Sequence, residues 1–317
     1  MLWIDKSIAA SISLQFTRCL RYALEKFLQQ VVNGLSLGSI YALIALGYTM
    51  VYGIIKLINF AHCDVYMIGA YVGYACMTFL HLGFTASLCI AMLVCMVLGV
   101  VIEKVAYKPL RNATRIAVLI TAIGVSYLLE YGMMYFMKAN VRTYPPMTGL
   151  LAKSFQLDGV TISMLQILIV AVTVILMIAL QLIVKKTRIG KAMRATSQDQ
   201  DAAELMGINV NTTISFTFAL GSALAGAAGV LVGVYYNSID PLMGFLPGLK
   251  AFVAAVFGGI GIIPGAMIGG YFIGAVETFV SGYGSSMYKD AIVFAILILV
   301  LIIKPSGLLG KATKEKV

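Results

Sequence analysis

One polar stretch, residues 185–213, orders its charged and small residues in a way that predicts a short helix. Basic residues come first and acidic residues follow. Asp199 or Asp201 can stand in the first turn of that helix, where a negative charge is stabilised by the helix dipole. Gly207 and the two residues after it can end the helix. A solvated loop would explain the charges, but it would not require the order Asp-Ala-Ala, three further residues, and Gly.

Two interruptions of apolar sequence are further candidates for a function. The first is Ile58-Asn-Phe-Ala-His-Cys-Asp64, and the second runs from Gly258 to Gly265. A helix broken at membrane depth is tolerated only where its backbone is buried or lines a cavity, so such breaks often mark a translocation pathway. The alternative is close helix packing through small residues, because many of the 31 glycines lie in apolar segments.

Carboxylates within apolar segments are costly to bury and are therefore candidates for function. Asp64, Glu130 and Glu277 stand in such segments, whereas Glu103 borders a basic loop and is expected at a membrane interface. The alternative for each acid is a hydrogen-bonded structural role or a place near an interface. The candidate translocation path comprises Asn59, His62, Asp64, Tyr66, Glu130, Gly258, Gly259 and Pro264.

The residues do not favour catalysis or metal binding. The five cysteines form no Cys-x-x-Cys pair and have no histidine at metal-ligand spacing, so we expect neither a metal site nor a disulfide framework. An intramembrane enzyme would need a nucleophile with a positioned base, and neither His62 nor His81 has an evident partner. We therefore expect no catalytic residues.

The composition requires that membrane-spanning helices position these residues. Of the 317 residues, 61% are hydrophobic and only 11% are charged, and the mean hydropathy is +0.95. Too few charges remain to cover a water-facing surface. This argues against a soluble enzyme, a nucleic-acid-binding protein and a disordered chain, and we expect no nucleic-acid partner.

The apolar segments predict an all-α, polytopic membrane protein with about eight or nine transmembrane helices, some of them short or broken. The run 65–102 contains more than one span, with a turn near His81 and Gly83. The last segment is too short to span unless residues 283–289 contribute. The apolar segments are 27–55, 65–102, 116–137, 159–184, 205–239, a run from 251 that is interrupted at 258–265, 266–280 and 291–303.

Basic residues cluster between these segments, at 104–115, at 185–194 and in the tail 304–316. The positive-inside rule places all three clusters in the cytoplasm. Three apolar segments precede the first cluster and predict an external N-terminus, whereas the leader's own basic residues weakly favour the opposite side. Residues 1–26 lack the pattern of a signal peptide. We expect them to be an N-terminal leader or interfacial segment ahead of a transmembrane domain, residues 27–317.

The sequence Asp201-Ala-Ala-Glu-Leu-Met-Gly207 resembles the EAA loop of binding-protein-dependent ABC importers, with Asp for the usual Glu. The family's downstream Ile-x-Leu-Pro is absent. In that family the loop forms a coupling helix that docks into a groove on the ATPase subunit. The resemblance implies that this role falls here to Asp199, Asp201, Ala202, Ala203, Glu204 and Gly207.

Longer motifs narrow this resemblance to the LivH-type permease subunits of high-affinity branched-chain amino acid importers. The similarity extends from about Phe27 to the C-terminus. One departure is Cys63-Asp64, where the family has Gly-Glu, and a change there can alter substrate preference if the segment lines the path. The motifs are 32–48, 58–62, 65–71, 250–252 and 258–270.

The resemblance implies a permease domain in the bacterial inner membrane, with its coupling loop and C-terminus cytoplasmic. Its expected partners are a second, LivM-like permease subunit, two cytoplasmic ABC ATPase subunits, a periplasmic amino-acid-binding protein and membrane lipid. No run matches a Walker A motif, so we expect no cofactor in this chain and ATP to be used by the partners. The ammonium and carboxylate of the amino acid would need polar partners near Asn59 to Asp64. The alternative function is a stand-alone secondary transporter or channel for small apolar solutes.

Overall fold

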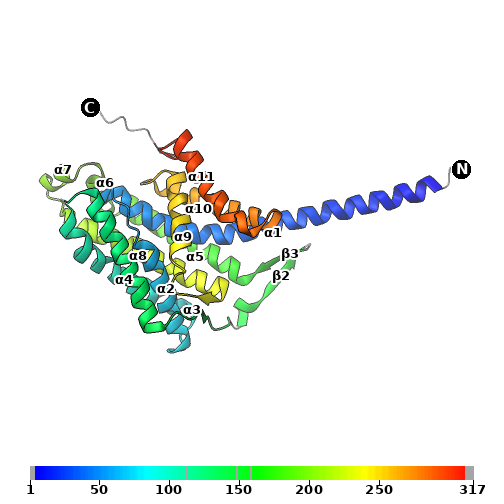
Figure 1. Ribbon diagram of the computed structural model, residues 1–317, viewed down its shortest axis with the longest axis horizontal. Helices are drawn as coiled ribbons and strands as arrows, with labels where there is room; N and C mark the ends of the chain where they lie inside the picture. The colour runs from blue at the N-terminus through cyan, green and yellow to red at the C-terminus, as the bar shows by residue number, and fades with distance from the viewer. Residues whose placement is uncertain (1–3, 112, 148, 158, 311–317) are drawn as a thin grey trace.

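The computed structural model describes residues 4–111, 113–147, 149–157 and 159–310 (Figure 1). Helices dominate the described chain and confirm the predicted all-α class. The helices are α1 (Ile4–Ile55), α2 (His62–Thr78), α3 (Phe84–Ile102), α4 (Arg115–Met137), α5 (Met164–Lys186), α6 (Arg188–Gln198), α7 (Gln200–Leu205), α8 (Val210–Tyr236), α9 (Phe245–Gly258), α10 (Ile263–Tyr283) and α11 (Lys289–Ile303).

Short elements complete the described fold. A π-helical turn, Glu103–Tyr107, extends α3 and is followed by a 3-10 turn, Lys108–Leu110; two further 3-10 turns are Gly149–Ala152 and Ser286–Tyr288. β1 (Arg142–Thr143) pairs antiparallel with β4 (Ser238–Ile239), with Arg142 opposite Ile239. β2 (Ser154–Leu157) and β3 (Val160–Ser163) form an antiparallel hairpin.

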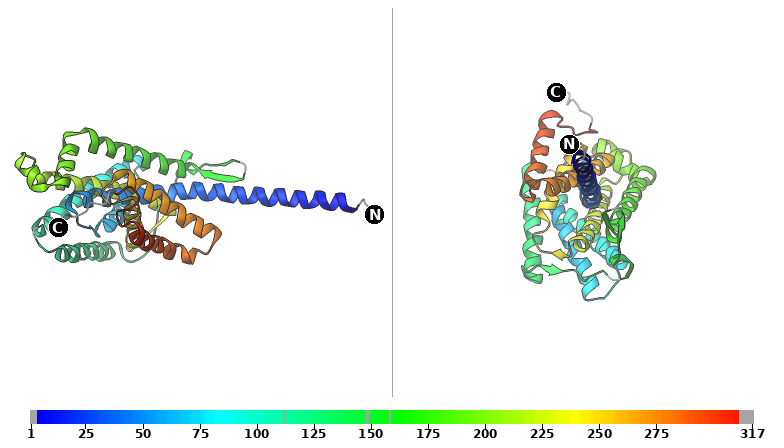
Figure 2. Two further views of the ribbon diagram at one scale, coloured as in Figure 1. Left: turned by 90° about the horizontal axis from the view of Figure 1, so that it is seen from above. Right: turned by 90° about the vertical axis from the view of Figure 1, so that its right-hand side faces the viewer.

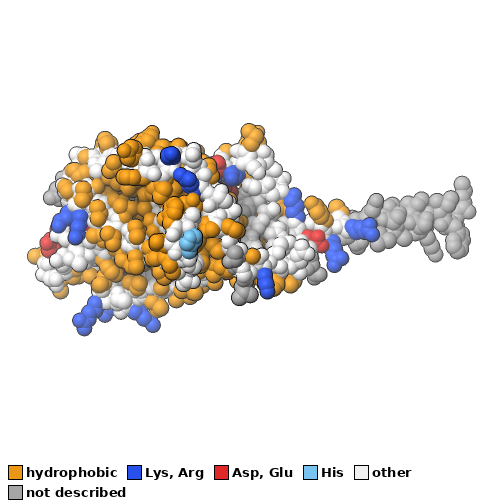
Figure 3. All heavy atoms as spheres, turned by 90° about the horizontal axis from the view of Figure 1, so that it is seen from below, with side chains coloured by type: hydrophobic (Ala, Val, Ile, Leu, Met, Phe, Trp, Pro, Cys, Tyr) orange, Lys and Arg blue, Asp and Glu red, His pale blue; other side chains and the backbone are white. Residues whose placement is uncertain are grey.

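Within the described chain, seven helices are long and apolar enough to cross a membrane, and α9 is a shorter apolar helix. The polytopic architecture is therefore as predicted. Hydrophobic side chains cover most of the face shown in Figure 3, where charged side chains are sparse. The seven long segments are Arg18–Ile55, Phe84–Leu110, Ile116–Met137, Met164–Lys186, Val210–Tyr236, Ile263–Tyr283 and Ser286–Ile303.

One predicted boundary was wrong in detail, and the condition predicted for the last span is met. The span expected from residue 159 begins at Met164, because residues 160–163 pair with β2 and Ser163 ends the strand as a helix cap. The Ser163 hydroxyl accepts a hydrogen bond from the Gln166 backbone N–H, and the Gln166 side chain accepts one from the Ser163 backbone N–H. Two backbone N–H groups at the start of α5, which have no acceptor within the helix, are satisfied in this way. The last apolar segment is lengthened by the turn Ser286–Tyr288, so that residues 286–303 suffice for a span.

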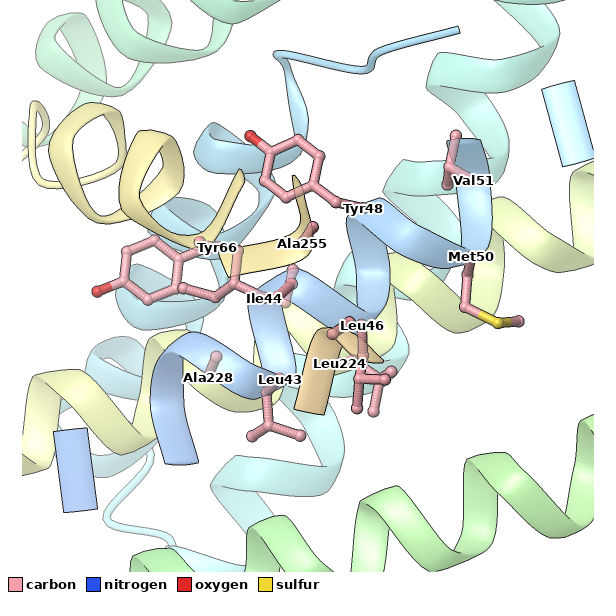
Figure 4. Packing of buried hydrophobic residues seen from close by; sticks show 14 of the residues in the cluster. Leu43, Ile44, Leu46, Tyr48, Met50, Val51, Tyr66, Leu224, Ala228 and Ala255 are labelled. Atoms are coloured by element: carbon pink, nitrogen blue, oxygen red, sulfur yellow. The ribbon is translucent and has the colours of Figure 1, made fainter. Parts of the chain in front are cut away.

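α1 and α8 form the centre of the bundle. Seen along α1, the other helices surround it, and its first turns project well beyond them (Figure 2). Leucine, isoleucine and tyrosine side chains from the second half of α1 pack against Leu224 and Ala228 of α8 and Ala255 of α9 (Figure 4). Burial of this apolar surface against neighbouring helices fixes the positions of the polar residues described below.

Glycines permit very close contact between these helices. A Cβ at Gly274 of α10 would overlap the backbone of Gly38 on α1, and one at Gly69 of α2 would lie 2.5 Å from the Cα of Gly226 on α8. Small residues let helix backbones approach each other in membranes, where lipid removes the hydrophobic drive for association. Close packing therefore accounts for these four glycines.

The two ends of the bundle differ in structure. At one end, which we call the α7 end, the Gln200 side chain donates to the carbonyl of Ile54 at the end of α1 (3.3 Å). The break between α9 and α10 lies at the same end, where Gly261 approaches Gly53 of α1. The opposite end carries the turns that follow α2, α4, α8 and α10, together with the two pairs of strands.

Candidate functional site

The predicted helix in the polar stretch is α7. The Asp199 carboxylate accepts a hydrogen bond from the Ala202 backbone N–H (3.0 Å) and caps the helix, while Asp201 stands in its first turn. Gly207, with φ of +82°, ends it in a conformation that strains other residues. The Ile208 N–H then bonds to the Ala203 carbonyl (3.0 Å). The sequence therefore predicted this helix and its two ends correctly.

Sequence reasoning missed the separate helix α6, which precedes α7. The hydroxyl of Thr187 caps α6 by accepting from the Gly190 N–H (3.0 Å). Met193 and Thr196 of α6 are buried against the bundle. The sequence carries a signal for this helix: Thr187, a residue type that caps helices, follows the last two basic residues of α5. The stretch between α5 and α8 is thus two short helices packed against the bundle, not an irregular loop.

The outer side of α7 is apolar at its tip. Leu205 is 88% exposed and Met206 is 83% exposed, whereas Ala203 is buried against the bundle. Beside them, a cavity of about 640 Å³ is lined by acids of α7 and by basic residues of the preceding turns. Its charged lining residues are Lys56, Lys108, Arg111, Asp201 and Glu204.

Glu103, expected at a membrane interface from its basic neighbours, lies buried near this cavity. It is 0% exposed. Its carboxylate accepts from Arg111 and from the Ser215 hydroxyl (2.6 Å). Arg111 also donates to Asn211 at the start of α8. The acid therefore ties the end of α3 to the first turns of α8, a role consistent with the structural alternative.

The first predicted break separates α1 from α2. Asn59 is buried and accepts a hydrogen bond from the Tyr107 hydroxyl (2.8 Å). His62 is also buried and packs edge-on against Tyr48, with 4.9 Å between ring centroids. Its Nε2 has no hydrogen-bond partner among the described residues. The break places these polar groups inside the bundle, next to α1 and the end of α3.

Asp64 and Glu130 meet at the interface of α2 and α4. Asp64 is fully buried and accepts from the Ser126 hydroxyl. Glu130 lies one turn further along α4, is 5% exposed, and lines a cavity of about 230 Å³ with Cys63 and Ser126. The structure thus brings two of the predicted path residues to one helix interface.

The second predicted break lies elsewhere, at the α7 end. Gly259 and Gly261 have φ of +104° and +91°, and Pro264 stands in the first turn of α10. The backbone N–H groups of Leu308 and Leu309 donate to the carbonyls of Phe257 (2.8 Å) and Gly258 (3.2 Å). The chain after α11 therefore covers this break. The structure does not bring it together with Asp64 and Glu130.

Tyr66, the remaining predicted residue, lines a third place, a cavity of about 420 Å³ toward the end opposite α7. We call it the Lys250 cavity. Its walls come from α1, α2, α8, α9, α10 and the start of α11, and its lining is mixed. The lining residues are Leu37, Tyr41, Tyr66, Val232, Tyr236, Ser238, Asp240, Leu242, Met243, Leu246, Pro247, Lys250, Glu277, Lys289 and Asp290.

An ion-pair network lines the Lys250 cavity. Lys250 Nζ is 2.8 Å from Glu277 Oε1 and 2.5 Å from Asp290 Oδ1. Lys289 Nζ is 3.3 Å from Glu277 Oε1, and the Tyr41 hydroxyl donates to Glu277 Oε2 (2.7 Å). Sequence reasoning considered Glu277 but left it out of the path. It missed Lys250, although a lysine within an apolar helix is itself a signal.

A comparison with known protein families covers both α7 and the cavities described above. The family model described as "Branched-chain amino acid transport system / permease component" matches residues 30–301. The chain belongs to this family. The match covers every transmembrane helix from the second half of α1 to most of α11, so that α7 and all three cavities lie within it.

Similar proteins span nearly the whole permease. The high-affinity branched-chain amino acid transport system permease protein BraD of Pseudomonas aeruginosa is 45% identical over 92% of this chain and 98% of its own length. The permease protein LivH of Escherichia coli K12 is also 45% identical, with the same two shares. A probable branched-chain amino acid transport permease protein LivH of Methanocaldococcus jannaschii is 31% identical over 87% of this chain and 90% of its own length. This chain is thus a multi-pass membrane permease component of a transport system.

Proposed function

We propose that this permease imports branched-chain amino acids across the bacterial inner membrane, driven by ATP that separate ATPase chains hydrolyse. The observation that carries the proposal is the 45% identity, over 92% of the chain, with two permease proteins named for high-affinity transport of these amino acids. The proposed partners are a second permease subunit, two ATPases and a periplasmic binding protein.

The orientation follows from the charges at the two ends of the bundle. The positive-inside rule counts Lys and Arg in short loops beside the spans. Such residues concentrate at the α7 end, which we therefore assign to the cytoplasm, and α1 then starts outside. The basic residues at the α7 end are Lys56, Lys104, Lys108, Arg111, Arg115, Lys185, Lys186, Arg188, Lys191, Arg194 and Lys304. The opposite end has Lys138, Arg142, Lys153 and Lys289 in its turns, and Lys6, Arg18, Arg21 and Lys26 in the first half of α1.

The surface of α7 supports the proposed docking of an ATPase. Leu205 and Met206 are exposed apolar side chains at the tip of a capped helix, where burial against an ATPase would remove them from water. α7 joins α8 through a short turn, and α8 packs against α1, α2 and α3 in the core. A push on α7 would therefore reach the helices at the centre, which supports switching between outward and inward states.

Reconstitution tests this function against the stand-alone alternative. The permease is placed in liposomes alone, and separately with its second permease, ATPases and binding protein, and uptake of labelled leucine is measured. We expect uptake only in the complete complex with ATP, and competition by isoleucine and valine but not by lysine. Leucine uptake by this chain alone, driven by an ion gradient, would contradict the proposal and support a secondary transporter.

A further inference from the structure

The Lys250 cavity contains charges of both signs in a place where charge is costly. The side chains of Lys250 and Glu277 are 5% and 4% exposed, and those of Lys289 and Asp290 are each 36% exposed. Within a membrane, ionisable side chains of this kind face cavities or partners and mark a functional site. The network holds two ammonium groups and two carboxylates, and the Asp240 carboxylate also lines the cavity, so a ligand meets charges of both signs.

One hydroxyl in this cavity lacks a partner. Tyr66 is 0% exposed and lines the cavity, yet its hydroxyl has no hydrogen-bond partner among the described residues. In Figure 4 the hydroxyl points away from the labelled apolar residues of the core. A buried polar group left unpaired is destabilising, because it has lost its hydrogen bonds to water, so the site is more favourable when a ligand supplies the partner.

The other walls of the cavity are aliphatic. Leu37, Val232 and Leu246 line it together with Met243. The volume, about 420 Å³, lies in the range of small-molecule sites. Lys289 and Asp290, the more exposed members of the network, stand at the start of α11, at the end opposite α7. The cavity is therefore reached from the side that we assign to the periplasm.

We propose that the Lys250 cavity binds the transported amino acid as it leaves the binding protein. The Tyr66 hydroxyl and the Lys289 ammonium receive its carboxylate, Asp290 receives its ammonium group, and the aliphatic wall receives its side chain. A zwitterion adds one charge of each sign, so its binding leaves the net charge of the cavity unchanged. The inference rests on the function proposed above, and it moves the expected contacts from Asn59–Asp64 to this cavity.

Two matched variants on α2 test the site. Tyr66→Phe removes the hydroxyl and keeps the ring. Tyr71→Phe is the control, because the Tyr71 hydroxyl is also buried and unpartnered among the described residues but does not line the cavity. Each variant is assembled with all partner subunits in liposomes, and leucine uptake and ATP hydrolysis stimulated by the binding protein are both measured.

For Tyr66→Phe we expect leucine uptake to fall at least about tenfold, since the variant loses a hydrogen bond to the charged carboxylate of leucine. ATP hydrolysis should persist, because assembly and α7 are unchanged, and Tyr71→Phe should match the wild type in both measurements. A second variant, Lys289→Gln at the rim, should lower uptake in the same way, and it decides the matter if Tyr66→Phe fails to assemble. Excess leucinamide, which lacks the carboxylate, should not compete with leucine.

The outcomes separate the two proposals. If the wild-type complex takes up leucine and both cavity variants do so at the wild-type rate, the site is wrong while the function stands. Competition by leucinamide as strong as that by unlabelled leucine would also overturn the site. If the complete wild-type complex takes up no branched-chain amino acid with ATP, the proposed function fails and this site falls with it.

Discussion

Lys250 on α9 and Glu277 on α10 form a buried ion pair, with 2.8 Å between Nζ and Oε1. The break between Gly258 and Ile263 joins the two helices, which pack side by side. The ion pair connects them a second time, at a distance from the break. Breaking a buried ion pair is costly because one charge loses its partner, and here each member of the pair also has a second ionic partner, Asp290 for Lys250 and Lys289 for Glu277. The pair therefore couples the positions of α9 and α10.

We expect Lys250→Met or Glu277→Leu alone to destabilise the permease by about 3 kcal/mol. In Lys250→Met the Glu277 carboxylate keeps Lys289 as an ionic partner, and in Glu277→Leu the Lys250 ammonium keeps Asp290. The double variant should lose less stability than the sum of the two single losses. Denaturant unfolding of the purified permease in detergent gives the three values. A double loss equal to the sum would show that the two side chains are not coupled.

The tip of α7 should be essential for coupling but not for folding. Leu205→Asp changes a side chain that is 88% exposed, so insertion and thermal stability should remain as in the wild type. A charge in an apolar contact with the ATPase should lower leucine uptake by at least about tenfold, because an interface anchor contributes about 2 kcal/mol or more. Met287→Asp is the control, since Met287 is 87% exposed at the opposite end.

Equal uptake by Leu205→Asp and Met287→Asp would remove α7 from the coupling surface. Loss of uptake in both would mean that an added acid disturbs the complex at either end. Only a loss confined to Leu205→Asp, with the complex still assembled, supports the docking of α7.

The cap of α7 should control how well the helix is formed. Asp199→Ala removes the acceptor of the Ala202 N–H and should cost about 1 kcal/mol of local helix stability. Hydrogen exchange of amides 202–205 should then be about fivefold faster, given that 1.4 kcal/mol is a factor of ten. Asp199→Asn keeps an acceptor and should exchange like the wild type. Equal exchange in all three chains would show that the cap does not stabilise α7.

Local signals in the sequence were sufficient for the two ends of α7 and for the break before α10, but they did not predict α6 or the start of α5. Asp199 and Gly207 predicted the start and end of α7, because capping and a positive φ depend on neighbouring residues alone. The break before α10 was visible as a run of glycines before Pro264 for the same reason. The hairpin β2–β3 was missed because strands of four residues give too little pattern to outweigh an adjoining apolar run.

The Lys250 cavity could not be predicted in this way. Lys250, Glu277 and Asp290 are brought together by the packing of three helices, and nothing in the spacing of the residues fixes that packing. The same limit explains why the predicted path residues divide among three places. Asp64 and Glu130 meet across α2 and α4, Tyr66 faces the Lys250 cavity, and Gly258 lies at the α7 end.

The contact between α1 and α10 should be the least tolerant of added volume. Gly274→Ala would place a Cβ against the backbone of Gly38, which neither helix can relieve by turning a side chain. Overpacking of this kind typically destabilises a protein by about 1–3 kcal/mol.

Gly132→Ala on α4 is the matched control, because a Cβ there has open space around it. That change should be neutral or stabilising by up to about 1 kcal/mol, since Ala favours the helix over Gly. Denaturant unfolding of both variants in detergent measures the difference, and equal stability of the two would show that α1 and α10 do not approach as closely as described.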